Sequence, residues 1–428
     1  MPGDRPKLYF IACCFPPFGR GNSLTNACVA NYLVEYFDTR VLCMERRDGL
    51  LLSYQEDQSL VAGLDTRLQV DRIRAGSWWG LNEILYAAGV LPCYYLNWVL
   101  SAWRKRQAWC ERGAIMAVYP VFSDLVLGYV LKRSTGNPLI VDFRDDFSGV
   151  MTRGWRCFLR GAYQKLEGLI LKQADAITVT TEFLGEDLII RHGLDPQKVK
   201  VVYNIVPPAE QRSQKANAAP AKFKIIYAGA MSQIQRPEIL LKAYARLRAT
   251  QPDLASRVEV DLYGPESRYF KLQIRKHLVE GAIFHGFCDR YEIAQQLQQT
   301  DIGFFSLADE TYAYATPTKL FEYIEFAIPI VAVLPQGAAR DIVERYDIGL
   351  VADPGDVDGL LHCLQTLCNS SELRARFRAN MECIRGQFSA DKQARKWRDI
   401  IGGLVGEETA TKALSVPVPE RRLPSRLL

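Results

Sequence analysis

The chain has 428 residues, enough for two domains of ordinary size. Hydrophobic residues make up 48% of it and charged residues 24%, a composition that excludes general disorder. The 53 basic and 48 acidic residues leave a net charge of +5, too small to indicate nucleic-acid binding.

The cysteines and histidines do not predict a metal site. Eleven cysteines are scattered without a C-x-x-C pair, and the four histidines have no paired spacing. Such cysteines are typical of small buried side chains in a reducing compartment. The first apolar run leads into a glycine turn and not into a cleavage site, so no secretory signal is predicted. We therefore expect a cytoplasmic protein.

The first predicted element is a strand at Leu8–Cys14, a nearly continuous apolar run. Gly19, Arg20 and Gly21 follow it, and residues 22–37 carry apolar side chains at helical spacing. Glycines between a buried strand and a helix let the backbone approach a ligand, and the helix start offers N–H groups to an anion. We therefore predict ligand-binding residues here; in an enzyme that transfers a group, Gly19 and Gly21 would bind the donor substrate and Arg20 would lie on the acceptor side. A simple capped turn is the alternative.

Residues 84–103 form an uncharged stretch long enough to span a bilayer. Strands are predicted before and after it, and a span would put them on opposite sides of a membrane. A buried or interfacial helical hairpin is therefore favoured. Trp98 and Trp103 lie in the stretch, and Arg104 begins a basic cluster directly after it. Aromatic and basic side chains together are typical of an anchor on an anionic membrane, and core packing of the aromatics is the alternative.

Further strands continue the alternation of strand and helix. In the first half we predict them at Arg40–Met44, Ala114–Tyr119, Leu139–Phe143, Ala176–Thr180 and Val199–Tyr203. Residues 207–220 are polar, rich in alanine and bounded by prolines, which predicts a linker. The second series of strands is predicted at Phe223–Tyr227, Val258–Tyr263, Ala282–His285, Ile302–Ser306, Ile330–Val333 and Gly349–Ala352.

Two such series predict an α/β fold with two Rossmann-like, doubly wound parallel sheets. Ligands of these sheets bind off the carboxyl ends of the strands, so two facing sheets would share one cleft. We predict an N-terminal domain over residues 1–206, a linker over 207–221 and a C-terminal domain over 222–387. A helix over 388–406 and a flexible tail over 407–428 complete the chain.

A charged segment ends the strand at Leu139–Phe143. Asp142, Arg144 and Asp145 stand there with a further aspartate, and such groups are costly to bury unless they face a cleft or one another. We predict Asp142 and Arg144 on the acceptor side and Asp145 as a catalytic acceptor-side group. An internal ion pair with Arg144 is the alternative.

The segment between the strands Ile302–Ser306 and Ile330–Val333 carries the main prediction. Pro317 suits the first turn of a helix and Thr316 its cap. The N–H groups of such a helix start hold phosphate, Lys319 adds charge, and Glu322 one turn later would accept hydrogen bonds from a ribose diol. A surface Lys–Glu pair is the alternative. The donor-binding residues predicted here are Thr316, Pro317, Thr318, Lys319, Leu320 and Glu322.

A second glycine turn follows the strand Phe223–Tyr227. Gly229 is its turn residue, and Arg236 precedes a helix predicted over residues 237–249. Arginine suits a diphosphate because it can clamp the group and stabilise the charge that builds on it as it leaves. Arg236 is therefore predicted as both a donor-binding and a catalytic residue, together with Lys319 as a second catalytic cation.

Taken together, these segments resemble the GT-B glycosyltransferases, specifically the family 4-like members. The resemblance covers nearly the whole chain and includes the F-P-P-x-G-x-G loop and the D-F-R-D segment. Its most specific part is the run P-x-K-L-F-E-Y-I-x-x-x-x-P-I-V-A that ends at Ala332. The resemblance implies a GT-B fold in which the N-terminal domain (1–206) binds the acceptor and the C-terminal domain (222–387) binds the nucleotide sugar. It also implies that the C-terminal helix returns to the N-terminal domain.

The resemblance also implies roles for residues. Glu322 would contact the donor ribose, and Arg236 with the 316–319 segment would hold the diphosphate. The transfer would retain anomeric configuration and need no metal or other cofactor. Two positions depart from the family pattern: Tyr314 stands where its first glutamate is expected, with Glu310 nearby at another spacing, and Gln235 stands where a phosphate-binding lysine is expected.

The sequence thus predicts a glycosyltransferase of polysaccharide or glycoconjugate biosynthesis. Its partners would be a nucleotide sugar, a saccharide or lipid-linked acceptor and an anionic membrane surface, with the protein peripheral on the inner face. Two alternatives remain open: a nucleotide-sugar 2-epimerase, which shares the fold, and a catalytically degenerate partner subunit, for which Tyr314 is the main argument.

Overall fold

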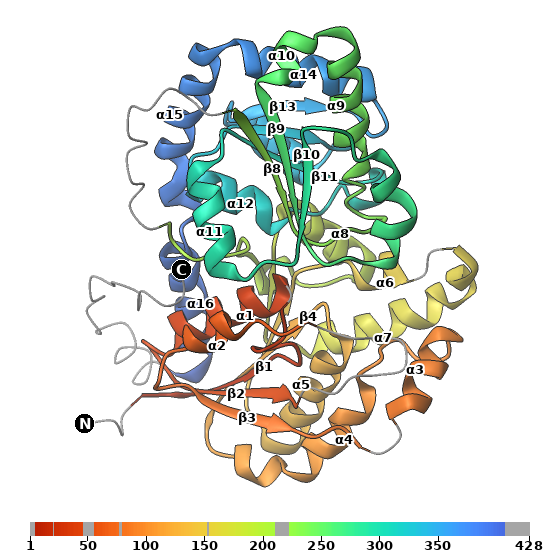
Figure 1. Cartoon of the computed structure of the whole chain (residues 1–428). Coiled ribbons are helices and arrows are strands. Elements are labelled where there is room, and N and C mark those ends of the chain that lie inside the picture. The colour runs from red at the N-terminus through yellow and green to blue at the C-terminus, as the bar shows by residue number, and fades with distance from the viewer. Residues whose placement is uncertain are drawn as a thin grey trace. The chain divides into compact units, whose positions relative to one another are not determined.

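The computed structural model describes residues 5–19, 21–45, 55–76, 79–151, 154–209 and 222–406. The chain divides into two compact units (Figure 1). Unit 1 comprises Met1–Ile205 with the segment that begins at Ala390, and unit 2 comprises Val206–Ser389. The predicted tail and most of the predicted linker lie outside the described residues.

Unit 1 contains a parallel sheet whose described strands follow the order β3-β2-β1-β4-β5-β6-β7. The strands are β1 (Lys7–Ile11), β2 (Asp38–Met44), β3 (Gln69–Ile73), β4 (Gly113–Tyr119), β5 (Leu139–Phe143), β6 (Ala176–Val179) and β7 (Val199–Val201). The helices are α1 (Gly21–Leu33), α2 (Gln58–Ala62), α3 (Trp79–Ala87), α4 (Leu96–Arg104), α5 (Phe122–Thr135), α6 (Phe147–Met151), α7 (Arg160–Gln173), α8 (Glu182–His192) and α16 (Ala390–Val405).

Both faces of this sheet are covered, which explains why its central strands are apolar throughout. Phe10 and Met116 point to the face that packs against α1 and α16. Ile11 and Ala117, their chain neighbours, point to the other face, where α5 approaches so closely that a Cβ on Gly128 would lie 2.7 Å from that of Ala117.

The helix α16 belongs to unit 1 although it comes last in the described chain. Trp397 on α16 is fully buried in the core formed by β1, β2, β4 and α1, and its indole N–H donates to Thr178 Oγ1 at 3.3 Å. Figure 1 shows the helix beside α1. The predicted return of the C-terminal helix to the N-terminal domain is therefore confirmed.

Unit 2 contains a second parallel sheet, and its described strands follow the order β10-β9-β8-β11-β12-β13. The strands are β8 (Phe223–Ala228), β9 (Val258–Tyr263), β10 (Ala282–Gly286), β11 (Ile302–Ser306), β12 (Ile330–Val333) and β13 (Gly349–Ala352). The helices are α9 (Glu238–Thr250), α10 (Pro252–Ser256), α11 (Arg290–Gln299), α12 (Thr318–Glu325), α13 (Ala338–Arg345), α14 (Val357–Asn369) and α15 (Ser371–Phe388).

The core of unit 2 lies between its sheet and the helices α9 and α14. Leu240 and Leu364 pack there against Ile225 and Val331. On the other face α12 lies so close to β11 that a Cβ on Gly303 would meet the ring of Tyr323 at 2.7 Å. The α/β class and both predicted parallel sheets are therefore confirmed.

The uncharged stretch folds as two short helices, α3 and α4, joined by a turn. None of the helices in the described part of the chain is long and apolar enough to cross a bilayer. The ring of Trp98 is fully buried, and its N–H donates to Ser123 Oγ at 2.9 Å, whereas Trp103 is 38% exposed. Core packing therefore holds for Trp98, so its expected place at the membrane surface is corrected, and Trp103 remains at the surface.

One strand was not predicted from the sequence. The edge strand β3 reads Gln-Val-Asp-Arg-Ile, and of its five residues only Ile73 is buried. It pairs with β2 in parallel from Arg40 opposite Gln69 to Met44 opposite Ile73. An edge strand contacts a neighbour on one side only, so its sequence lacks the continuous apolar run by which the buried strands were found.

We expect Trp397→Ala to destabilise unit 1 by about 3–5 kcal/mol, because it removes a buried indole and leaves a cavity. The measurement is urea unfolding followed by far-UV circular dichroism. Trp103→Ala, which removes an exposed indole from the same unit, is the matched control and should shift the unfolding midpoint little. Equal shifts for the two variants would contradict the role assigned to α16.

Candidate functional site

The site is best defined in unit 2, at the point where its strand order reverses. Successive strands run outward from β8 to one side and from β11 to the other, and ligands of such sheets bind off the carboxyl ends at this point. Gly229 directly follows β8, and α12 follows β11. The two predicted donor segments therefore meet at the same edge of the sheet.

Lys319, in the first turn of α12, reaches back to Gly229. A Cβ on Gly229 would lie 2.5 Å from Lys319 Nζ, and Gly229 adopts φ +145°, which disfavours any other residue. The same Nζ lies 4.9 Å from the centre of the Tyr227 ring. Gly229 thus leaves room for the ammonium at the end of β8.

This ammonium is buried without a carboxylate partner. Lys319 is 7% exposed, and it forms no ion pair with any residue that the structure describes. Burial lowers the pKa of Lys319 to about 8, and the nearby charge of Glu322 opposes this effect only in part. A buried cation of this kind favours the binding of an anion.

The start of α12 differs by one residue from the prediction. The helix begins at Thr318, and Pro317 occupies the cap position with φ −58° and ψ 146°, so Thr316 does not cap the helix as predicted. Thr316 and Leu320 are buried, and Thr318 is half-buried. The first N–H groups of α12 still lie beside Lys319, where they add positive partial charge.

Glu322 is buried one turn beyond Lys319 and pairs with Arg290, which donates to its Oε1 from the start of α11. Both side chains are nearly inaccessible. The alternative of a surface Lys–Glu pair is therefore excluded, because Glu322 is neither at the surface nor bonded to Lys319. Arg290 was not singled out from the sequence, since it lies 32 residues from Glu322 and no local pattern links the two.

Arg236 lies on the loop between Gly229 and α9 and is 52% exposed at its side chain. Its backbone has φ 40°, and its Nε lies 3.3 Å from Glu238 Oε1. The carbonyl of Gln235, which stands at the expected lysine position, accepts a hydrogen bond from Ser306. Tyr314 is buried, whereas Glu310 is exposed. Arg236 is therefore the one of these residues that presents an exposed positive charge in the predicted donor-binding segment.

In unit 1, Asp142 and Arg144 form the internal ion pair that was the alternative to an acceptor-side role. Arg144 Nε donates to Asp142 Oδ2 at 2.6 Å, and its NH1 donates to Asn26 Oδ1 at 2.9 Å. Thr178 Oγ1 also donates to Asp142, at 2.6 Å. These contacts tie β5 to β6 and α1.

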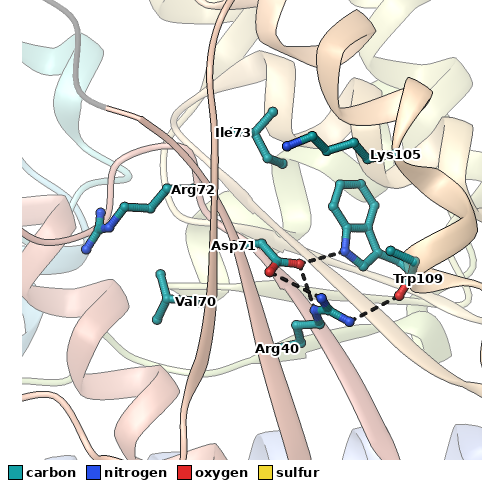
Figure 2. Close-up of a pocket in the computed structure, with 8 residues that line it drawn as sticks. Arg40, Val70, Asp71, Arg72, Ile73, Lys105 and Trp109 are labelled. Atoms are coloured by element: carbon teal, nitrogen blue, oxygen red, sulfur yellow. Dashed lines mark hydrogen bonds and ion pairs between the residues drawn. The ribbon is translucent and has the colours of Figure 1, made fainter.

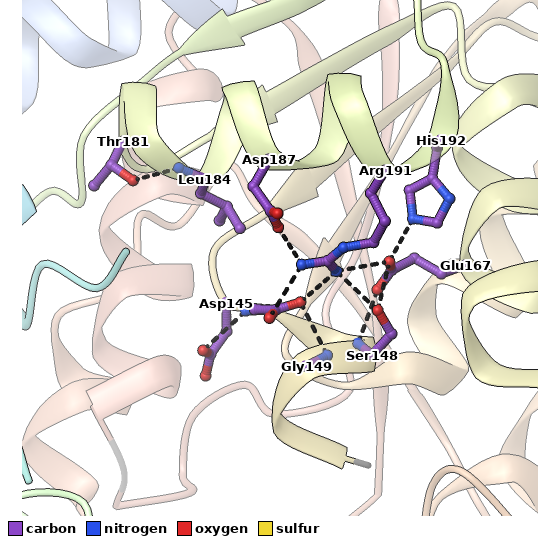
Figure 3. Close-up of polar contacts among 10 residues, drawn as sticks. Asp145, Ser148, Gly149, Glu167, Thr181, Leu184, Asp187, Arg191 and His192 are labelled. Atoms are coloured by element: carbon purple, nitrogen blue, oxygen red, sulfur yellow. Dashed lines mark hydrogen bonds and ion pairs between the residues drawn. The ribbon is translucent and has the colours of Figure 1, made fainter. Parts of the chain in front are cut away.

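Asp145 is the most accessible of the three aspartates in this segment. Asp146 bonds Arg191 at 2.7 Å, and Arg191 also contacts Glu167 at 3.2 Å, which in turn accepts from Ser148 N–H at 2.9 Å. Asp145 Oδ1 accepts from the N–H of Asp146 at 3.0 Å, and Figure 3 shows its side chain turned away from the Arg191 cluster. The cluster anchors the loop that carries Asp145.

The strand order of unit 1 reverses between β1 and β4, and a buried carboxyl lies there. Asp124, on the first turn of α5, accepts from the N–H of Cys13 at 2.7 Å, and burial raises its pKa. This residue was not predicted, because a single aspartate in an apolar helix forms no recognisable pattern.

The glycine loop after β1 was predicted to bind a ligand. The N–H of Gly19 donates to the carbonyl oxygen of Gln55 at 2.8 Å, and Gly21 begins α1. Arg20 lies outside the described residues.

A cavity of about 300 Å³ lies along the edge strand β3. Figure 2 shows Arg40 and Trp109 turned toward Asp71. Arg40 Nε donates to Asp71 at 2.7 Å and Trp109 Nε1 at 2.8 Å, so these polar groups satisfy one another. Among the residues described, no group of three or more histidine, cysteine or acidic side chains could hold a metal ion.

Two family models match the chain. The model of glycosyl transferases group 1 matches residues 209–382, and the model of the glycosyl transferase 4-like domain matches residues 36–204. Two curated relatives are D-inositol 3-phosphate glycosyltransferases. The one from Salinispora tropica is 24% identical over 56% of this chain and 53% of its own length. The one from Jonesia denitrificans is 25% identical over 53% of this chain and 57% of its own. The chain therefore spans about half the length of the curated relatives it matches.

Solved structures share the fold. The Anabaena protein HepE in complex with UDP and glucose superimposes with a TM-score of 0.68 at 17% identity, covering 94% of this chain and all of HepE. The sucrose-phosphate synthase from Thermosynechococcus elongatus superimposes with a TM-score of 0.69 at 14% identity, covering 92% of this chain and 98% of the other. At these identities the likeness shows the GT-B fold and nothing finer.

The lowered pKa of Lys319 predicts how stability depends on pH. Between about pH 8 and 10.4 the unfolded chain holds a proton on this lysine that the folded chain has released, so stability rises with pH by up to about 3 kcal/mol. Lys319→Met should lack this rise, and Lys271→Met, at an exposed lysine, should keep it. Urea unfolding at several pH values measures both, and parallel curves for all three proteins would contradict the assignment.

Proposed function

Because this chain belongs to the group 1 glycosyl transferases of the GT-B fold, we propose that it transfers a glycosyl group from a nucleoside diphosphate sugar to a saccharide or lipid-linked acceptor. The observation that carries the proposal is the buried ammonium of Lys319 beside Gly229. It lies at the start of a helix and at the reversal point of a parallel sheet, where phosphate groups bind.

Each part of the donor has a candidate partner in unit 2. The diphosphate would bind the first N–H groups of α12 and the ammonium of Lys319, with Arg236 as an exposed second cation. The ribose diol would donate to Glu322, which lies one turn further along the same helix. The HepE structure, which contains UDP and glucose, has the same fold and supports this choice of donor class.

The chemistry asks the site to stabilise a leaving diphosphate. The bond between the anomeric carbon and the phosphate oxygen breaks, and its electron pair stays on that oxygen. The acceptor oxygen bonds the anomeric carbon and loses its proton to a base. Lys319 and Arg236 would stabilise the charge that builds on the diphosphate, and Asp145 remains the candidate catalytic group on the acceptor side.

The proposal includes two finer features that the family resemblance implies. The transfer needs no metal ion, because Lys319, Arg236 and the start of α12 can take over the charge compensation that a divalent cation provides elsewhere. It retains anomeric configuration. Since Tyr314 replaces the first glutamate of the family pattern, other groups would recognise the sugar hydroxyls.

We extend the proposal to a peripheral position on the inner face of a membrane, with a role in polysaccharide or glycoconjugate synthesis. The hairpin patch, which we define as the exposed apolar residues of the α3–α4 hairpin, supports it: Leu81, Ile84, Val90, Leu100 and Trp103. Leu81 and Ile84 share one helical face, as do Leu100 and Trp103. Exposed Arg104 is the last residue of α4, and the guanidinium of Arg106 stacks on Trp103 at 4.2 Å.

A donor-binding experiment tests the first proposal. We expect UDP or GDP to raise the melting temperature of the protein, and this shift to persist in EDTA. Lys319→Met should weaken binding about tenfold or more, because it removes a charged partner of the diphosphate. Arg340→Gln, which breaks the ion pairs of Arg340 with Glu344 and Asp353, is the matched control. If no nucleoside diphosphate stabilises the protein, the proposal is wrong.

Turnover separates the enzyme from a degenerate subunit and from an epimerase. Hydrolysis or transfer of a bound nucleotide sugar, lost in Glu322→Ala and Arg236→Ala with the fold intact, would exclude the degenerate subunit. An epimerase would instead convert the nucleotide sugar into its 2-epimer, which product analysis detects.

A vesicle experiment tests the membrane position. We expect the protein to sediment with vesicles rich in phosphatidylglycerol more than with phosphatidylcholine vesicles, since each basic residue near an anionic surface adds about 1 kcal/mol. Ile84→Ser, in the hairpin patch, should reduce sedimentation, and Ile190→Ser, at a still more exposed apolar residue of α8, should not. Equal behaviour of the two variants would contradict the patch as the contact surface.

A further inference from the structure

The acidic and basic residues of α12 stand at a spacing that usually pairs them. Lys319 and Glu322 are three residues apart on one helix, and opposite charges at this spacing commonly attract each other. Here they separate: Lys319 Nζ lies against Gly229 and the Tyr227 ring, while Glu322 bonds Arg290. Something must hold the carboxylate away from the ammonium, because both are buried and would otherwise gain by pairing.

Arg290 has the position to do this. It is the first residue of α11, a helix capped by Asp289, whose Oδ1 accepts from the N–H of Glu292 at 2.9 Å. Its guanidinium is buried and donates to Glu322 Oε1. The helix α11 also contacts β8, the strand that leads to Gly229. Arg290 is therefore held by the same sheet against which Lys319 lies.

The charges explain what the arrangement achieves. Arg290, Glu322 and Lys319 bring two positive charges and one negative charge into a buried region. The Arg290–Glu322 bond neutralises the carboxylate, which leaves the ammonium of Lys319 as the net charge. A buried net charge is unfavourable in the free protein and becomes favourable when an anion binds.

We propose that Arg290 is a positioning residue of the donor site, which keeps Glu322 from closing on Lys319. With Oε1 held by Arg290, the carboxylate presents its other oxygen to the ribose diol, and the ammonium stays available to the diphosphate. This inference rests on the proposed function of the site, and it assigns Arg290 an action through Glu322 and Lys319 and not a contact with the donor.

Calorimetric binding of three probes tests it: UDP, 2′,3′-dideoxy-UDP and inorganic pyrophosphate. In the wild-type protein we expect UDP to bind at least about tenfold more tightly than the dideoxy analogue, the factor that one hydrogen bond to a charged group contributes. In Arg290→Gln the freed carboxylate pairs with Lys319, so this preference should vanish and pyrophosphate should bind about tenfold more weakly.

The double variant Arg290→Gln/Glu322→Gln gives the readout that a merely structural role would not produce. It removes the carboxylate that would neutralise Lys319, so the affinity for pyrophosphate should return toward the wild-type value while the preference for the ribose diol stays lost. Arg290→Lys, which keeps a cation at the position, should retain part of both. Arg340→Gln is the control for loss of an ion pair elsewhere in unit 2.

The outcomes separate the two proposals. If the wild-type protein binds neither nucleotide, the proposed donor site itself is wrong. If the wild-type protein binds UDP but pyrophosphate affinity does not recover in the double variant, Arg290 does not act through Glu322 and the inference is overturned. If Arg290→Gln does not fold, Arg290→Lys and the double variant decide, since neither leaves the carboxylate buried without a partner.

Discussion

The proposed donor site depends on one interaction, the approach of the Lys319 ammonium to the backbone of Gly229. A lysine so deeply buried loses its hydration, and the lowered pKa reflects that cost. Two features offset this cost: the residue after β8 is a glycine, which leaves room for the ammonium, and the aromatic ring of Tyr227 lies beside it. Any side chain at position 229 would displace the charge.

The two units differ in whether their buried cations have carboxylate partners. In unit 1 the two arginines near the loop after β5 both have carboxylate partners: Arg144 bonds Asp142, and Arg191 bonds Asp146 and Glu167. These networks stabilise loops and leave neither arginine as an uncompensated cation for an anionic ligand. In unit 2 the bond between Arg290 and Glu322 has the opposite consequence, because it leaves Lys319 as a buried cation. This difference favours unit 2 as the place where a nucleoside diphosphate binds.

The predictions from the sequence were right for elements with a strong local pattern and wrong for features that depend on packing between elements. Central strands such as β4 were predicted because burial on both faces produces an unbroken apolar run. The edge strand β3 was missed because it lacks such a run. Trp98 and Trp103 looked alike in one aromatic stretch, yet one is buried and the other exposed. Which of them faces the core depends on how α4 packs against α5, and the spacing of the two residues does not reveal it.

Local sequence patterns were enough to predict the alternation of strands and helices, the two parallel sheets, and the glycine turn and the helix that form the candidate site of unit 2. These follow from local propensity and apolar periodicity, which act over a few neighbouring residues. Which charged side chains pair follows instead from how distant elements pack against one another. Lys319 and Glu322 are close in sequence yet separate, whereas Arg290 reaches Glu322 from a distant helix. Buried charges interact strongly with the charges nearest to them in space. Which charges are nearest depends on the packing of distant segments, and a local sequence pattern does not contain this information.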